Sequence, residues 1–109
     1  MTVKNLTKNT ILTTDLKIAI SLSDQFLGLL KKSNPRSLLF RTRFGIHTFF
    51  LKDSIDVLIL DDKNIVIKAI IVNPNLIFLW NIRYSSVLEL PEDTIKTSKT
   101  TLNDVIEII

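Results

Sequence analysis

Two nearly continuous apolar segments lie close together in the middle of the chain, and they constrain its fold more than any other feature. Ile55–Leu60 and Ile65–Val72 are separated only by the four residues Asp61–Asn64. Segments this apolar and this rich in β-branched residues are typical of strands buried on both faces. Asn64 tolerates the positive φ that a tight turn requires. The sequence therefore predicts a β-hairpin over residues 55–72.

The rest of the pattern predicts more short strands and little helix. Further strands are expected at 17–22, 37–40, 46–51, 76–80, 86–90 and 105–109. Apolar residues recur at helical spacing between Leu22 and Leu30, so one amphipathic helix is expected over about 23–32, before Asn34-Pro35 ends it. Pro91 is expected to begin a short second helix, with acidic residues at its positive end.

Many short strands rich in isoleucine favour a closed architecture, because closure hides strand edges that would otherwise aggregate. We therefore expect a mainly β (α+β) fold: a small closed or nearly closed β-barrel of about seven short strands with one or two short helices. The chain has 109 residues, 46% of them apolar, which suits one domain over residues 1–109.

Composition excludes several classes of protein. No run of 18 apolar residues lacks a charge or proline, and residues 1–14 show no apolar signal core, so we expect no membrane contact and a cytoplasmic location. Cysteine is absent and His47 is the single histidine, which excludes disulfide scaffolds, thiol nucleophiles and cysteine-based metal sites. We expect no cofactor and no dedicated metal site.

Charge is distributed unevenly although the net charge is only +3. No acidic residue occurs between Asp24 and Asp53, where six basic residues fall. Five of them form the candidate surface for nucleic acid or another polyanion: Lys31, Lys32, Arg36, Arg41 and Arg43. The alternative is a solvated rim, which so small a net charge favours.

A longer motif resembles a known family. Ile46–Asp61 reads IHTFFLKDSIDVLILD and is similar to the central motif of the family called domain of unknown function 192 (uncharacterised protein family 0127). Three further segments agree in order: VKNLT at 3–7, GLL at 28–30, and SVLELP at 86–91 with NDVIEI at 103–108. The family's glycines in two turns are Asn64 and Asn103 here, which keep access to the left-handed region. The resemblance implies a small β-barrel, and it implies no reaction or cofactor.

The polar residues of this motif are the candidates for chemistry. We expect a small polar or anionic ligand near His47, Lys52, Asp56 and Arg83, in a domain that is not catalytic. The alternative role for His47 is a hydrogen bond to backbone, and for Asp56 it is to accept N–H groups or to pair with Lys52 or Arg83. Asp104 is likewise expected to accept hydrogen bonds in a turn.

Two other functions remain open at this level. The basic stretch within residues 31–52 predicts nucleic-acid binding that weakens with salt. A hydrolase-like enzyme would use His47 as the general base, with Asp56 orienting it. The chain is expected to be a monomer or a homodimer.

Overall fold

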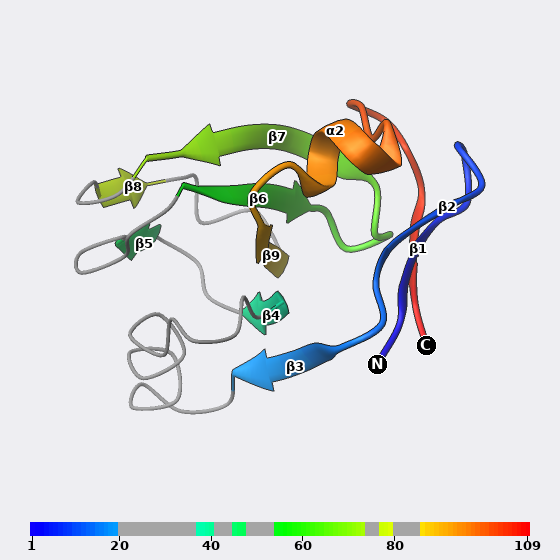
Figure 1. Ribbon diagram of the computed structural model, residues 1–109, viewed down its shortest axis with the longest axis horizontal. Coiled ribbons are helices and arrows are strands. Elements are labelled where there is room, and N and C mark those ends of the chain that lie inside the picture. Colours follow the sequence, from blue (N-terminus) through cyan, green and yellow to red (C-terminus); the bar gives the residue numbers. More distant parts are fainter. Residues whose placement is uncertain (20–36, 41–44, 48–53, 74–76, 80–85) are drawn as a thin grey trace.

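The computed structural model describes residues 1–19, 37–40, 45–47, 54–73, 77–79 and 86–109, which form ten strands and one helix (Figure 1). The strands are β1 (Val3–Asn5), β2 (Thr10–Thr13), β3 (Leu16–Ala19), β4 (Ser37–Phe40), β5 (Gly45–His47), β6 (Ile55–Leu60), β7 (Val66–Val72), β8 (Ile77–Leu79), β9 (Ser86–Pro91) and β10 (Ile106–Ile108). The helix is α2 (Thr94–Ser98). The predicted helix at 23–32 lies outside the described residues.

A five-stranded sheet in the order β3-β4-β9-β6-β7 forms the main body of the described part. β3 pairs with β4 in parallel, and every other neighbouring pair in this sheet is antiparallel. β4 and β6 have the bounds predicted from sequence, and the three inner strands β4, β9 and β6 are almost wholly buried. Short apolar segments therefore occupy the centre of the sheet.

The predicted hairpin is confirmed as β6 and β7. Asp61 Oδ1 accepts hydrogen bonds from the backbone N–H groups of Lys63 at 2.8 Å and Ile65 at 2.9 Å, and Asn64 has φ 60°. The expectation that both strands are buried on both faces is right for β6 and wrong for β7. β7 is the last strand in the order, so no described strand covers its outer edge, and it has an exposed residue on each face: Lys68, and Ile71 with 64% exposure.

A second, three-stranded sheet joins the two ends of the chain in the order β10-β1-β2. Thr2 and Ile109 exchange backbone hydrogen bonds of 2.7 and 2.9 Å, and the N- and C-termini lie close together (Figure 1). The sheet meets the main sheet where Ile65 forms a β-bridge with Val105 and the amide of Val66 donates to the carbonyl of Asp104.

The apolar core lies on both faces of the main sheet. One cluster packs between this sheet, the three-stranded sheet and α2, and contains Val3, Leu16, Leu39, Leu58, Leu60, Val66, Leu88, Leu90 and Ile106. The other lies on the opposite face and contains Leu38, Phe40, Val57, Ile59, Val72 and Val87. We call these the α2 face and the far face.

The predicted barrel is wrong. Within the described residues the strands form three separate sheets, the third being β5 with β8, and the edge strands β3 and β7 of the main sheet do not pair with each other. The terminal strands pair with one another instead of closing the main sheet, which a local sequence pattern does not reveal.

The helix also differs from expectation. Pro91 is the last residue of β9, and α2 begins three residues later, after Asp93 has entered the left-handed region at φ 70°. Its first turn contains no acidic residue. Among the residues that the structure describes, no helix is both long and apolar enough to cross a membrane.

Candidate functional site

Two buried carboxyl groups lie on neighbouring strands in the middle of the main sheet. Asp56 of β6 stands opposite Leu90 of β9, and the next pair along is Val57 with Glu89. Directly opposite residues of an antiparallel pair share a face, and successive residues alternate between faces. Because Leu90 belongs to the cluster of the α2 face and Val57 to that of the far face, Asp56 points toward α2 and Glu89 points to the far face.

Asp56 holds the start of α2. Its side chain is fully buried, and its Oδ2 accepts a hydrogen bond of 2.6 Å from the backbone N–H of Ile95. Burial raises the pKa of Asp56 above its ordinary 3.8, while backbone N–H groups of Ile95 and Asp93 offset part of that effect. A free N–H at a helix start needs an acceptor, and Asp93 supplies none from its own side chain. Asp56 therefore serves as a cap that comes from a distant strand.

Glu89 has no such partner within the described part of the chain. The residue is 3% exposed, and its Oε1 is buried without a hydrogen bond. Its strand neighbours on the far face are Leu38 across β4 and Val57 across β6, both apolar. Burial in these surroundings raises the pKa of Glu89 from 4.5 to about 8, so the carboxyl group is mostly protonated at neutral pH.

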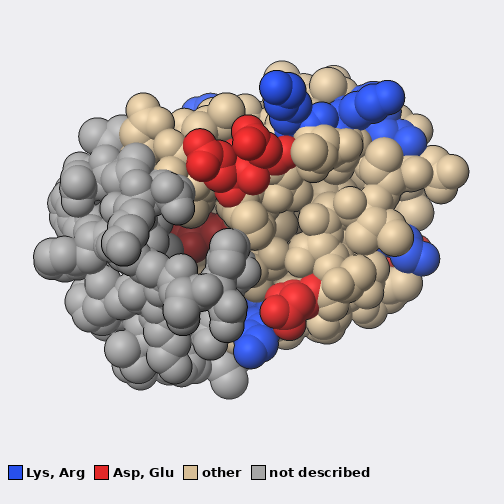
Figure 2. Space-filling view, viewed as in Figure 1, with Lys and Arg blue, Asp and Glu red and all other residues tan. Residues whose placement is uncertain are grey.

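In the space-filling view, acidic atoms are visible at the border of the described part, set deeper than the other charged groups of this face (Figure 2).

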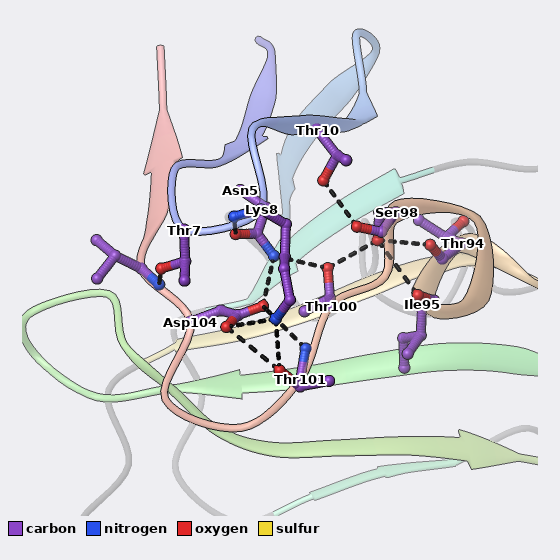
Figure 3. Close-up of polar contacts among 11 residues, drawn as sticks. Asn5, Thr7, Lys8, Thr10, Thr94, Ile95, Ser98, Thr100, Thr101 and Asp104 are labelled. Atoms are coloured by element: carbon purple, nitrogen blue, oxygen red, sulfur yellow. Dashed lines mark hydrogen bonds and ion pairs between the residues drawn. The ribbon is translucent and has the colours of Figure 1, made fainter.

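A polar network on the other side of the molecule ties the N-terminal hairpin to the C-terminal segment (Figure 3). Asn5 is 1% exposed, and its Nδ2 donates to Thr100 Oγ1 at 3.0 Å and to Asp104 Oδ2 at 2.8 Å. Its Oδ1 accepts from the backbone N–H of Lys8 at 2.9 Å. Ser98 continues the network, since its hydroxyl lies 2.7 Å from Thr100 Oγ1 and donates to the carbonyl of Thr94.

Asp104 is the charged centre of this network. Lys8 Nζ lies 3.0 and 2.9 Å from its two carboxylate oxygens, and the backbone N–H of Thr101 donates to Oδ2 at 2.9 Å. Burial raises the pKa of Asp104, but the hydrogen bonds from Asn5, Thr101 and Lys8, with the charge of Lys8, outweigh it and lower the pKa to about 2. No buried side-chain atom of this network lacks a hydrogen-bond partner, so the network stabilises the fold.

The predicted site residues are only partly described. His47 ends β5, where it pairs with Ile77 of β8, and its side chain is not described. Asp56 accepts a hydrogen bond from a backbone N–H group, which is one of the alternative roles predicted for it from the sequence. The other predicted residues lie outside the described part: Lys52 and Arg83 for a ligand, and Lys31, Lys32, Arg36, Arg41 and Arg43 for a polyanion.

Sequence reasoning missed Glu89, Asn5 and Lys8. The signal for Glu89 was available, since it is the one charged residue of the apolar segment SVLEL and is followed by a further apolar residue. Asn5 and Lys8 carried no local signal, because their partners lie more than 90 positions away. In the described ranges no three His, Cys, Asp or Glu residues gather in a group that could hold a metal ion.

Two solved structures share the fold. A chain described as a candidate transcription regulator from Sinorhizobium meliloti 1021 has a TM-score of 0.76 and 15% identity, covering 97% of this chain and 89% of that one. A protein of unknown function from Novosphingobium aromaticivorans DSM 12444 has a TM-score of 0.75 and 12% identity, covering 98% of this chain and 82% of that one. No protein-family model matches the sequence, and the comparison with curated proteins gives no match. The likeness concerns the fold alone, and the resemblance to domain of unknown function 192 stays a prediction.

Proposed function

We propose that the chain is a non-catalytic binding domain that takes a small polar ligand on the far face of the main sheet, with Glu89 as its hydrogen-bonding group. The observation that carries this proposal is the buried Oε1 of Glu89, which lies among apolar neighbours and has no hydrogen-bond partner among the residues that the structure describes. The cytoplasmic location and the membership of the family domain of unknown function 192 belong to the same proposal.

A comparison of the three buried carboxyl groups supports this choice. Asp56 caps α2 through its Oδ2, although its Oδ1 is buried without a partner, and Asp104 joins the two ends of the chain, so both carboxyl groups stabilise the fold. The Oε1 of Glu89 has no hydrogen-bond partner among the described residues, so no bond there offsets its desolvation, which costs about 1–3 kcal/mol for an unsatisfied polar group. A ligand that bonds to Glu89 would offset this cost only in the bound state.

The protonation state of Glu89 defines the class of ligand. At neutral pH the protonated carboxyl group presents one O–H donor and keeps an acceptor oxygen. It therefore suits a ligand with an oxygen that accepts a hydrogen bond, such as a hydroxyl, carbonyl or carboxylate group. The cations predicted from sequence, Lys52 and Arg83, would favour the carboxylate within this class.

A thermal-shift screen with matched variants tests the proposal. The panel holds sugars, amino acids and small carboxylic acids, because a compound that binds the folded state raises the midpoint of unfolding. A compound that stabilises the wild type should have no effect on Glu89→Leu and a reduced effect on Glu89→Gln, which keeps a donor and an acceptor. The control is Asp56→Asn, on the opposite face, which should keep the shift. The proposal is overturned if no compound in the panel moves the midpoint, or if the shift persists in Glu89→Leu.

Polyanion binding is the second candidate function. The observation that favours it is the stretch between Asp24 and Asp53, which holds six basic residues and no acidic one. It predicts retention on a heparin column at low salt and an affinity for short DNA that falls steeply as salt rises. Retention that is lost in Arg41→Ala with Arg43→Ala would favour this function over the first. Catalysis by His47 with Asp56 has weaker support, since Oδ2 of Asp56 is engaged by Ile95.

A further inference from the structure

The outer face of the three-stranded sheet carries exposed apolar side chains around two opposite charges. Lys4 of β1 lies directly between Glu107 of β10 and Ile11 of β2, so the three residues form one row across the sheet. Their neighbours Val3, Asn5 and Ile106 are buried on the inner face, which places the row outside. Ile11 is 58% exposed.

The neighbouring rows extend this outer face. The amide of Leu6 donates to the carbonyl of Val105 at 2.8 Å, so these two residues continue the register of β1 and β10 in one direction. Thr2 and Ile109 continue it in the other direction. Leu6, Val105 and Ile109 are all exposed. Exposed apolar residues that share one face mark an interaction surface more often than the same residues scattered singly.

The two charged side chains of the middle row form no ion pair within the described part of the chain. Lys4 and Glu107 stand opposite each other but form no ion pair, whereas Lys8 and Asp104 do. In the space-filling view the flank on the side of β1 and β2 is mostly uncharged, with a small charged area at its edge (Figure 2). The face thus offers one positive and one negative charge inside an apolar surround.

We propose that this outer face binds a second copy of the chain, through a two-fold axis that runs parallel to the strands between β1 and β10. Such an axis places Lys4 against Glu107 of the partner subunit, and Glu107 against Lys4 of the partner subunit. It also places Leu6 against Val105 of the partner subunit. The face is therefore complementary to itself, as a two-fold interface requires.

A two-fold axis in the plane of this face could run parallel or perpendicular to the strands, and the two charges favour the parallel axis. A two-fold axis perpendicular to the strands, through the middle row, would place Lys4 against its own copy and Glu107 against its own copy. Like charges that meet across an interface disfavour association. The strand-parallel axis is thus the arrangement that satisfies both charges.

The area of this face determines how strong a dimer is expected. An axis between β1 and β10 brings only these two strands against the partner subunit, and two strands about 4.8 Å apart and five residues about 3.3 Å long outline roughly 160 Å² per copy. This is well below the area of roughly 800 Å² per partner in stable complexes, so we expect a weak dimer with a dissociation constant of roughly 10⁻⁵ to 10⁻³ M.

Sedimentation velocity across a concentration series tests the proposal with charge-reversal variants. The wild type should form a dimer as its concentration approaches about 1 mM. Lys4→Glu and Glu107→Lys should each weaken self-association at least tenfold, because each places like charges across the axis. An equimolar mixture of the two variants should recover dimers, since each charge then meets its opposite in the other copy. The controls are Lys17→Glu and Glu92→Lys, which make the same charge changes at exposed residues away from this face and should associate as the wild type does.

Recovery in the mixture distinguishes an interface effect from misfolding, because a variant that does not fold cannot be rescued by another variant. A wild type that stays monomeric up to about 1 mM overturns the proposal. So does a mixture that remains as monomeric as its separate components, or a pair of single variants that dimerise as the wild type does.

Discussion

Asp56 and Glu89 lie on adjacent strands one position out of register, so their carboxyl groups point to opposite faces of the same sheet. The two side chains are chemically alike and similarly buried, and each has one buried oxygen without a partner, yet within the described residues only Asp56 receives a hydrogen bond, at its Oδ2. The difference follows from what covers each face: α2 supplies an N–H group to Asp56, and the described neighbours of Glu89 are apolar. One carboxyl group therefore supports the fold, and the other is the group on which the proposed ligand site rests.

Removing the carboxyl group of Asp56 should destabilise the protein. Asp56→Ala leaves the backbone N–H of Ile95 without its acceptor in a buried position, so the free energy of unfolding should fall by about 1–3 kcal/mol. Asp56→Asn retains a carbonyl acceptor and should lose less. Urea unfolding measures both, with Asp62→Ala, in the exposed hairpin turn, as a control that should change stability by less than about 0.5 kcal/mol. Equal stability of Asp56→Ala and the control would contradict the capping role.

Glu89 should make the protein less stable as the pH rises above the acidic range. The folded state keeps a proton on Glu89 up to a pH of about 8, whereas the unfolded state loses it near pH 4.5. Between these values the folded state binds the extra proton, so stability falls with rising pH by at most about 1.4 kcal/mol per unit and levels off above pH 8. Glu89→Gln carries no ionisable group there and should be flatter over the same range.

The measurement is urea unfolding of the wild type and Glu89→Gln at intervals from pH 4.5 to 9. The informative quantity is the difference between their free energies of unfolding, because titration of other groups is common to both. This difference should favour the glutamine variant increasingly up to pH 8. A difference that does not change with pH would show that Glu89 titrates normally.

Asp104 should make the protein more stable as the pH rises, which is opposite to the effect of Glu89, and it should do so at lower pH. Its pKa of about 2 in the folded state lies below the 3.8 expected when the chain is unfolded. The stability it contributes is therefore complete above about pH 4 and is lost as the pH falls through 2. Asp104→Asn should be less stable than the wild type at neutral pH, and the gap between them should narrow on acidification. Circular dichroism during acid titration follows both proteins, and a gap of constant size would rule out this origin.

The sequence predicted the inner strands well because their signal is local. Ser37–Phe40 and Ile55–Leu60 are short apolar segments that needed only burial on both faces to be strands, and both were confirmed with their bounds. β2 was missed because TILT between Asn9 and Thr14 is only partly apolar, and its pairing with β1 makes it a strand. The barrel was wrong for a related reason: which edges pair depends on contacts between distant segments.

In the candidate site, too, features with a local sequence signal were predicted and features that depend on distant segments were not. A carboxylate beside apolar residues must find donors, so accepting roles for Asp56 and Asp104 followed from the sequence and were confirmed. The donors themselves could not be predicted, since Ile95 is 39 positions from Asp56 and Asn5 is 99 positions from Asp104. Glu89 was missed because a single charge within a strand usually marks its solvent face. Here the strand lies between β4 and β6 and buries both of its faces.

The left-handed residue of the central hairpin, Asn64, should respond differently to two substitutions that both remove its side chain. Asn64 has φ 60°, a conformation that costs an ordinary residue about 1–2 kcal/mol. Asn64→Ala should therefore destabilise the protein by about 1 kcal/mol, while Asn64→Gly, which removes the same side chain and adopts this φ freely, should stay within about 0.5 kcal/mol of the wild type. Lys63→Ala, at the preceding exposed position, is the control and should be neutral. Thermal and urea unfolding of the three variants compare them directly, and similar losses in Asn64→Ala and Asn64→Gly would show that the side chain of Asn64, and not its backbone conformation, stabilises the turn.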